Sequence, residues 1–482
     1  MSVQIPNLSL IMGIINLIGA LIIIHYERRT PRTAILWLLI LFVVPAYGLI
    51  AYYLFGLSMH RTRRRYRTKE AQDRRGLDDL AALITADGPA PMMEDGLTDY
   101  SSLIRMLGAN RVRLTYRNKV NLINDGEDKF RMLFTDLERA ADHIHAEYYI
   151  VRDDELGNRF LDLLGKKAEE GVDVRLLVDG VGTRLSKGRV SELRAQGVKF
   201  LYFFPPVIER FPALNLRINH RNHRKIVVID GLIGYLGGYN VGDEYLGLKR
   251  GVGRWRDTHL RIEGAAVQDL QARFLLDWDF TSSRPLEIEP RFFPPPGRAG
   301  EGAVQIVSGG PDKREDLVKE EYLKMIASAR HRIYIQSPYF VPDESVLDAL
   351  RVAALSGVEV RIMVPRLPDH PLVHWASLDY LGELVGSGVR AYLFEDGFLH
   401  AKAIVVDGLI ASIGSANWDI RSFTLNFETN AIVYCKEVAA RQEEAFFDDL
   451  ASCQEWTLRD HQARSPWVRL KCGFSRLFSP LM

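Results

Sequence analysis

One stretch of this sequence occurs twice, and that duplication constrains the fold more than any other feature. Each copy contains His-x-Lys, a β-branched run, Asp-Gly, a second apolar run, Gly-Gly or Gly-Ser, and then Asn. All matching positions stand 177 residues apart (400 − 223 = 177). The matched residues are His223, Lys225, Asp230, Gly238 and Asn240 in the first copy and His400, Lys402, Asp407, Ser415 and Asn417 in the second. Two copies in register indicate a duplicated half-site.

Each copy predicts a short hairpin. Residues 226–229 and 403–406 are apolar and mostly β-branched, which suits buried strands, and the Asp-Gly that follows each run is typical of a two-residue turn. Side chains two residues apart on a strand share a face, so the His and Lys of each copy project together. Asp230 and Asp407 stand at the turns, at an odd offset from the His. We expect them to fix the hairpin rather than touch substrate.

Each copy ends with small and amide side chains. Gly238 and Ser415 allow a bulky group to approach the backbone closely. Asn240 and Asn417 can donate amide hydrogens to such a group. We therefore predict that these four residues bind phosphate.

Two histidines and two lysines suit phosphodiester transfer without a metal. One neutral histidine attacks phosphorus while the other, protonated, gives its proton to the departing alkoxide. Lysines and asparagines stabilise the charged oxygens of the pentacoordinate transition state. The sequence has no P-loop and no Gly-x-Gly-x-x-Gly that opens a helix, so no nucleotide and no other cofactor is expected.

Both copies match in full the HxKxxxxD motif, and residues 110–455 resemble the phospholipase D superfamily. The run Trp-Arg-Asp-Thr-His at 255–259 and the Gly-Asp-Glu-Tyr-Leu at 242–246 resemble its bacterial cardiolipin synthases. The resemblance implies a catalytic set of His223, Lys225, Asp230, His400, Lys402 and Asp407.

Histidines of this kind need carboxylates that hold the ring and its tautomer. The second half continues with the family's N-x-D-x-R-S…N-x-E extension, which implies that Glu428 holds the histidine there. Asp243, Glu244 and Asp257 are the candidates in the first half, and the subgroup run favours Asp257. A helix N-cap is the alternative for Asp243.

Helices and strands alternate in the same order around both copies. This pattern predicts an α/β fold of two tandem repeats, at 111–290 and 300–455, each a mixed sheet flanked by helices. Neither repeat holds a complete acid–base pair, so the site is expected where they meet. The expected helices and strands are 130–141, 147–151, 158–170 and 172–178 in the first repeat and 317–329, 332–336, 345–355 and 358–364 in the second.

The chain begins with two apolar runs, at about 5–24 and 34–55, each long enough for a bilayer core of roughly 30 Å. We predict a transmembrane hairpin over 1–58, followed by a basic juxtamembrane segment and linker over 59–110. A signal peptide is the rival reading of the first run, but no basic residue precedes it. The arginine cluster at 61–67 favours a cytoplasmic catalytic region at a bacterial inner membrane.

The tail at 456–482 is basic and aromatic, with apolar residues three to four apart. An interfacial helix and a helix docked on the domain are the two alternatives. The whole chain has 62 basic and 61 acidic residues, and this balance does not point to nucleic acid. The sequence does not indicate an oligomeric state.

The resemblance implies a phosphatidyltransferase that converts two phosphatidylglycerols to cardiolipin and glycerol, with both lipids as its membrane partners. In the family the first-half histidine is usually the nucleophile, which implies this role for His223 and the role of acid and base for His400. The sequence alone does not assign the two roles. A membrane-bound phospholipase D, transfer to another alcohol and a nuclease of the same superfamily remain the alternatives.

Overall fold

The computed structural model describes residues 8–27, 31–52, 97–204, 220–249, 251, 253–282, 288–297, 299–312, 315–367, 369–477 and 479 of the 482-residue chain. Two compact units divide it. One comprises 1–72 with 206–219, and the other comprises 73–205 with 220–482. The predicted segment at 59–110 lies outside the described residues up to 96.

The N-terminal unit contains three helices, α1 (Leu8–Glu27), α2 (Pro31–Val43) and α3 (Pro45–Ala51). The single helix expected at 34–55 is instead broken between α2 and α3, because Pro45 lacks an N–H and clashes with a continuing helix. Within 8–27 and 31–52, as in the rest of the described chain, no helix combines the length and apolarity needed to cross a membrane.

The larger unit opens with η2 (Leu97–Tyr100) and α5 (Ser101–Ala109), and two tandem repeats follow. The first repeat contains β1 (Leu114–Ile123), α6 (Gly126–Glu138), β2 (His143–Tyr148), α7 (Glu155–Glu169), β3 (Asp173–Asp179), α8 (Lys187–Ala195), β4 (Lys199–Phe203), β5 (Ile226–Ile229), β6 (Ile233–Gly237), η4 (Asp243–Leu246), β7 (Trp255–Arg256), β8 (His259–Glu263) and α9 (Ala266–Thr281). A short connection contains η5 (Pro290–Phe292).

The second repeat replays the order and adds elements at its end. It contains β9 (Gly302–Gly309), α10 (Leu317–Ser328), β10 (Arg332–Gln336), β11 (Phe340–Val341), α11 (Glu344–Leu355), β12 (Glu359–Pro365), α12 (Pro371–Val385), β13 (Arg390–Phe394), β14 (Phe398–Leu399), β15 (Ala403–Val406), β16 (Ile410–Gly414), β17 (Trp418–Asp419), α13 (Ile420–Thr424), β18 (Glu428–Tyr434), α14 (Lys436–Leu450) and β19 (Cys453–Trp456). The tail forms α15 (Leu458–Gln462) and α16 (Pro466–Leu477).

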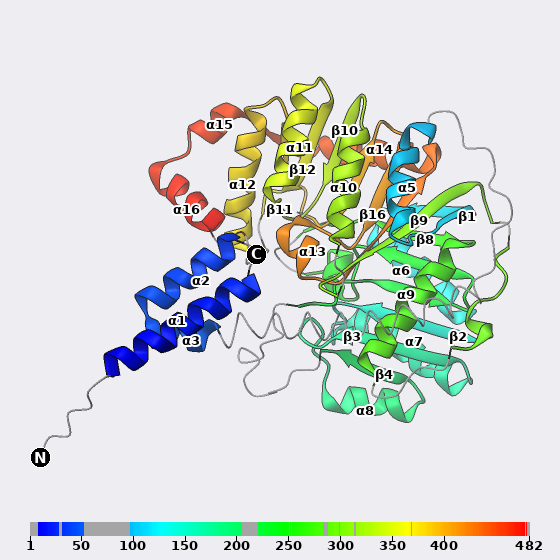
Figure 1. Ribbon diagram of the computed structural model, residues 1–482. Helices are drawn as coiled ribbons and strands as arrows, with labels where there is room; N and C mark the ends of the chain where they lie inside the picture. Colours follow the sequence, from blue (N-terminus) through cyan, green and yellow to red (C-terminus); the bar gives the residue numbers. More distant parts are fainter. Residues whose placement is uncertain are drawn as a thin grey trace, which may run out of the picture. The chain divides into compact units, whose positions relative to one another are not determined.

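The two repeats share one mixed sheet of 15 strands (Figure 1). From the centre outward the first repeat runs β1-β8-β6-β5-β2-β3-β4, and the second runs β9-β18-β16-β15-β10-β12-β13-β19. The central strands β1 and β9 pair antiparallel. This edge-to-edge pairing joins what the sequence predicted as two sheets, and it removes two exposed strand edges.

Helices cover both faces of the sheet, as the α/β pattern predicts. On one face α6 and α7 pack over the first repeat and α10 and α11 over the second, while α9 and α14 cover the central strands on the other. Helix α5 packs against α10 through Leu103 and Leu107, so it belongs to the core of the second repeat.

The strand expected at 147–151 begins earlier, at His143. His143 and His145 are both buried within β2. The His145 ring stacks on Phe274 of α9 with centroids 4.7 Å apart, and Gln271 donates to its Nδ1 over 2.8 Å. Aromatic packing and one amide thus replace the apolar residues that usually mark a buried strand.

Candidate active site

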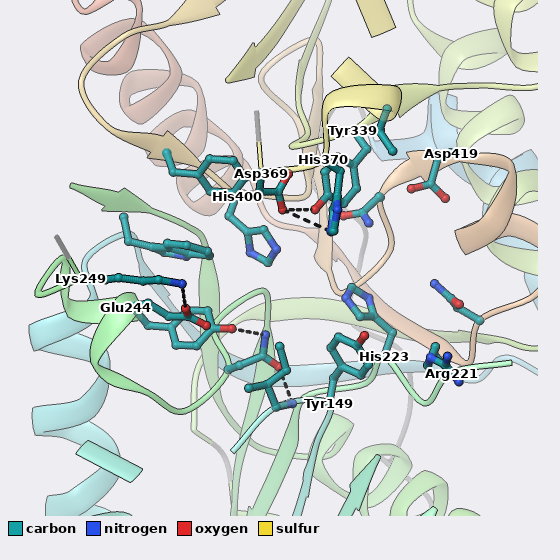
Figure 2. Close-up of a pocket in the computed structure, with 18 of the residues that line it drawn as sticks. Tyr149, Arg221, His223, Glu244, Lys249, Tyr339, Asp369, His370, His400 and Asp419 are labelled. Carbon is teal, nitrogen blue, oxygen red and sulfur yellow. Dashed lines mark hydrogen bonds and ion pairs between the residues drawn. The ribbon is translucent and has the colours of Figure 1, made fainter. Parts of the chain in front are cut away.

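The two motif histidines stand immediately before equivalent strands. His223 precedes β5 and His400 precedes β15, and both line a cavity of about 670 Å³ between the repeats. Figure 2 shows the two rings facing this cavity from opposite sides. The prediction that the site lies where the repeats meet therefore agrees with the geometry.

The ring of His223 is held from behind. Its Nδ1 lies 3.0 Å from both carboxylate oxygens of Glu428 and 3.0 Å from the carbonyl oxygen of Ser415. Its backbone N–H donates to the carbonyl of Phe427 over 3.0 Å. Because Nδ1 faces these acceptors, it carries the proton, and Nε2 has the free lone pair of a nucleophile.

The ring of His400 is held in the same manner. Its Nδ1 lies 2.5 Å from Asp257 Oδ2, and its backbone N–H donates to the carbonyl of Arg256 over 2.7 Å. The rings of Trp255 and Phe398 lie beside it, with centroids at 5.1 and 6.0 Å. The strand pair β7–β14 fixes this wall.

Each orienting acid comes from the opposite repeat. Glu428 of the second repeat holds His223 of the first, and Asp257 of the first holds His400 of the second. The sequence indicated both acids but placed each of them, Asp257 as well as Glu428, with the histidine of its own half. Short backbone bridges between the repeats, β7–β14 and Asn222–Phe427, produce the exchange.

Gly238 and Ser415 lie behind the histidines, and neither lines the cavity. A Cβ on Gly238 would stand 1.9 Å from Asp257 Oδ1, so the glycine leaves space for that carboxylate. The Ser415 hydroxyl donates to Glu428 Oε2 over 2.5 Å. These two residues therefore support the orienting acids, and their predicted phosphate contact stays a prediction.

The two lysines each follow their histidine by two residues and are buried. Lys225 Nζ donates to the carbonyl of His223 over 2.5 Å, and Lys402 Nζ lies 2.8 Å from His400 Nδ1. Burial lowers the pKa of Lys225 to about 7 and that of Lys402 to about 8. An anionic phosphate between them would favour their charged forms.

Burial lowers the pKa of His223 to about 4, against the opposing influence of Glu428. The pKa of His400 is also lowered, by burial and then by the charge of Lys402. Burial alone would raise the pKa of each orienting acid. Neighbouring positive charge instead holds the pKa of Glu428 and of Asp257 below the ordinary value. Both carboxylates are therefore charged at neutral pH.

The two asparagines line the cavity. Asn240 accepts from the N–H of Ile150 over 3.1 Å and donates to the hydroxyl of Tyr245 over 2.9 Å. Asn417 Oδ1 is buried without a hydrogen-bond partner among the described residues. Both positions suit contact with substrate, although Asn240 already uses part of its amide.

Asp230 and Asp407 lie at the hairpin turns, outside the cavity. Each adopts a positive φ, 53° and 55°, and accepts three backbone N–H bonds at the start of the neighbouring strand. They tie the β5–β6 turn to β2 and the β15–β16 turn to β10. These bonds suit the expected role of fixing the hairpin turns, and the place of both residues in the implied catalytic set stays a prediction.

Several cavity residues did not stand out in the sequence. Tyr149 packs beside His223 with ring centroids 5.0 Å apart, and Arg221 and Arg421 line the same side. On the opposite side Glu244 accepts from Arg152 over 2.9 Å and from Lys249 over 3.0 Å. Glu244 could have been found from the sequence, because it belongs to the Gly-Asp-Glu-Tyr-Leu run at 242–246. It was considered there only as a candidate orienting acid.

A family model described as "Cardiolipin synthase, PLD-like domain" matches residues 133–278 and 322–450, one segment in each repeat. The chain belongs to this family. A second model, "Phospholipase_D-nuclease N-terminal", matches residues 14–56. The two cardiolipin synthase-like segments contain both histidines and both orienting acids.

Relatives named as cardiolipin synthases match nearly the whole chain. A "Cardiolipin synthase" of Staphylococcus aureus strain Mu50 is 45% identical over 479 residues, which covers 97% of this chain and 95% of that one. The "Major cardiolipin synthase ClsA" of Bacillus subtilis is 45% identical over 489 residues and covers 100% of both chains. A crystal structure of phosphatidylserine synthase from Haemophilus influenzae shares the fold, at TM-score 0.61 and 13% identity, over 79% of this chain and all of that one.

Proposed function

We propose that this protein is a phosphatidyltransferase that joins two phosphatidylglycerols into cardiolipin and releases glycerol. The observation that carries the proposal is the pair of histidines in one cavity, each held by a buried carboxylate of the other repeat. The family supports the same reaction. Transfer exchanges one phosphodiester for another, so no nucleotide is needed to drive it.

In the first step His223 Nε2 attacks the phosphorus of one phosphatidylglycerol. The bond from phosphorus to the glycerol headgroup breaks, and His400 gives its proton to the departing oxygen. Burial lowers the proton affinity of His400, but a bound phosphodiester anion and Asp257, 2.5 Å away, favour the imidazolium. The product of this step is a phosphatidyl group on His223 and free glycerol.

In the second step the headgroup hydroxyl of another phosphatidylglycerol replaces glycerol. His400, now neutral, takes the hydroxyl proton as the oxygen attacks phosphorus, and the bond to His223 breaks. Lys225, Lys402, Asn240 and Asn417 are proposed to stabilise the charged phosphoryl oxygens in both steps. The cycle ends with cardiolipin, a neutral His223 and a protonated His400.

Water is the competing acceptor, and it would make the protein a phospholipase D that forms phosphatidic acid. Aromatic side chains beside His400, Trp255 and Phe398, favour a lipid acceptor because they reduce the water next to the base. A nuclease is disfavoured by the balance of 62 basic and 61 acidic residues.

The decisive assay supplies phosphatidylglycerol alone in mixed micelles, without nucleotide or added metal. Glycerol, cardiolipin and phosphatidic acid are measured together. Glycerol matched by cardiolipin, and lost in His223→Ala and His400→Ala, supports the proposal. Phosphatidic acid as the main product contradicts the transferase and leaves the two-histidine chemistry in place.

The N-terminal unit is proposed to anchor the enzyme in a bacterial inner membrane, with the catalytic unit in the cytoplasm. Support comes from the outward-facing Leu17 and Leu21 of α1 and from the N-terminal family match. The arginine cluster at 61–67 supports the orientation. Protease treatment of spheroplasts tests it: the catalytic unit should be cleaved only after the membrane is opened, and cleavage in intact spheroplasts contradicts the orientation.

A further inference from the structure

Helix α16 carries an exposed apolar stripe. Trp467, Leu470, Phe474 and Leu477 are 73, 61, 56 and 74% exposed. Their spacing of three, four and three residues places them on one side of the helix. Large apolar side chains gathered in this way on a surface indicate a site of interaction.

The opposite side of α16 is fixed to the domain. Cys472 and Ser475 are buried there, and Arg476 pairs with Asp379 over 3.2 Å and with Glu383 over 2.7 Å. Both acids belong to α12, and Figure 1 shows α16 alongside that helix. The helix is therefore docked on the domain, which was one of the two alternatives from the sequence, and its apolar stripe faces outward.

The charges on α16 indicate what kind of surface covers the stripe. The helix has no acidic residue, and Arg469 and Lys471 are exposed. Apolar and aromatic side chains flanked by cations suit the headgroup region of an anionic bilayer. An apolar protein partner would not require the flanking positive charge.

The helix beneath α16 leads directly to the active-site cavity. His370, just before α12, and Val373, in its first turn, line that cavity. Leu367 also lines it and is 54% exposed, and Leu372 is 51% exposed. An apolar rim therefore lies at the end of the helix on which α16 is docked.

We propose that α16 lies in the headgroup region of an anionic bilayer and holds the rim of the cavity against it. The lipid headgroup can then reach the histidines while its acyl chains stay among other lipids. The identification of phosphatidylglycerol as the lipid rests on the proposed function, whereas the contact of α16 with a lipid surface does not.

A fluorescence measurement on the full chain tests the contact without relying on activity. Bimane is attached at Phe474→Cys, with Cys435, Cys453 and Cys472 replaced by Ala, and the protein is reconstituted in phosphatidylglycerol vesicles that contain nitroxide lipid. We expect strong quenching at this position and little at a matched label, Leu355→Cys on the exposed side of α11. Equal quenching at both, or none at Phe474→Cys, overturns the proposal.

The same labels separate the possible occupants of the stripe. A second copy of the chain or the N-terminal helices would shield the label from nitroxide lipid, so quenching would be absent and the proposal contradicted. In phosphatidylcholine vesicles we expect quenching about threefold weaker, because the flanking cations lose their anionic partners. Unchanged quenching there would overturn the anionic preference.

A second variant links the contact to turnover. Trp467→Ser with Phe474→Ser should lower the rate on phosphatidylglycerol vesicles about tenfold, since two aromatic anchors are lost. The rate on monomeric short-chain phosphatidylglycerol should stay within about twofold, and so should both rates of Leu355→Ser. An equal loss on both substrates shows a structural role for the stripe and contradicts the proposal. If no variant makes cardiolipin but the quenching persists, the proposed function fails and this inference stands.

Discussion

His223 and His400 occupy equivalent positions but differ in their surroundings. Tyr149 stands beside His223, whereas His400 lies beside both Trp255 and Phe398, which contact each other. Glu428 presents both carboxylate oxygens to His223, and Asp257 presents one to His400. The wall that Trp255 and Phe398 form beside His400 is thus apolar. This suits a residue that manages a proton while a lipid alcohol enters and leaves.

The orienting role of Glu428 predicts a large loss of rate on a small change of charge. Glu428→Gln keeps the side-chain volume but no longer fixes the protonated Nδ1 of His223, so kcat should fall by about 10³-fold or more. The acid limb of the pH profile should also move to lower pH, because Glu428 raises the pKa of His223. Steady-state rates over pH measure both effects.

Asp243→Asn is the matched control for Glu428→Gln. Asp243 accepts from the backbone N–H of Leu156 over 2.8 Å and touches neither histidine. Its substitution should leave kcat within about twofold, because a partial loss at a cap costs only about 1 kcal/mol of stability. A loss equal to that of Glu428→Gln would contradict the assignment of the acid.

The pKa directions at the site predict an optimum on the acid side of neutrality. His223 is the nucleophile only when neutral, so activity rises with pH through its pKa of about 4. Lys225 and Lys402 act only when charged, so activity falls as pH rises through pKa values of about 7 and 8. The lowered pKa of His400 shifts the basic limb the same way. A profile of kcat/KM that still increases at about pH 9 contradicts this account.

Residue types could be predicted from the sequence better than residue roles. The repeated motif identified both histidines and both lysines, because these residues recur at a fixed spacing in both copies. A small residue beside a site has two physical readings, space for substrate or space for another side chain. Gly238 and Ser415 follow the second reading, since Asp257 and Glu428 fill the space behind the histidines. Spacing alone does not separate these cases.

At the scale of elements, the β5–β6 and β15–β16 hairpins position the histidines and lysines of the motif. A clamp at each turn ties the hairpin to the start of the strand beside it. Strands β5 and β15 are only four residues long. A slip of one residue would turn His223 and Lys225 to the other face of the sheet. The clamps thus protect the register on which the site depends.

Asp230→Ala should destabilise the protein by about 2–4 kcal/mol, because three backbone donors lose their acceptor and alanine disfavours a positive φ. Asp230→Asn should lose less, because its amide oxygen still accepts and asparagine tolerates this backbone. Thermal unfolding measures both variants. The folded fraction of Asp230→Ala should keep nearly the native kcat. A loss as severe as that of His223→Ala would support the place of Asp230 in the catalytic set.

At the scale of the whole molecule, the two repeats form one enzyme because each completes the site of the other. The fully buried Arg224 also connects the two repeats. It pairs with Asp277 over 2.7 Å in its own repeat and donates to Thr429 over 2.9 Å and to the carbonyl of Gly309 over 2.9 Å in the second. One side chain thereby joins β5, α9, β9 and β18.

Arg224→Met should lower the free energy of unfolding by about 3 kcal/mol, because it leaves the buried carbonyl of Gly309 and the hydroxyl of Thr429 without this donor. Asp277 also loses one of its two cations and keeps Arg273. Arg351→Met removes an exposed pair with Asp348 and should cost at most about 1 kcal/mol. Thermal unfolding in detergent compares the two. Equal midpoints would show that the buried cation does not join the repeats.

The tandem α/β architecture could be predicted from the alternation of helices and strands, since that signal is local. The joining of the two sheets through β1 and β9 could not, because strand pairing across repeats leaves no periodicity in the sequence. The exchange of Glu428 and Asp257 follows from the same long-range pairing. Both half-sites are therefore visible in the sequence, whereas the way in which each supplies the acid of the other is not.

Trapping of the covalent intermediate tests the central claim most directly. Phosphatidylglycerol labelled in its phosphate is mixed with His400→Ala and with His223→Ala, and protein-bound label is measured after rapid denaturation. Our account predicts label on His400→Ala, at His223, because this variant retains the nucleophile held by Glu428. The label should form slowly, since the acid of the first step is missing, and it should persist, since the base of the second step is missing too. Label on His223→Ala alone would contradict the account, since His400 would then be the nucleophile.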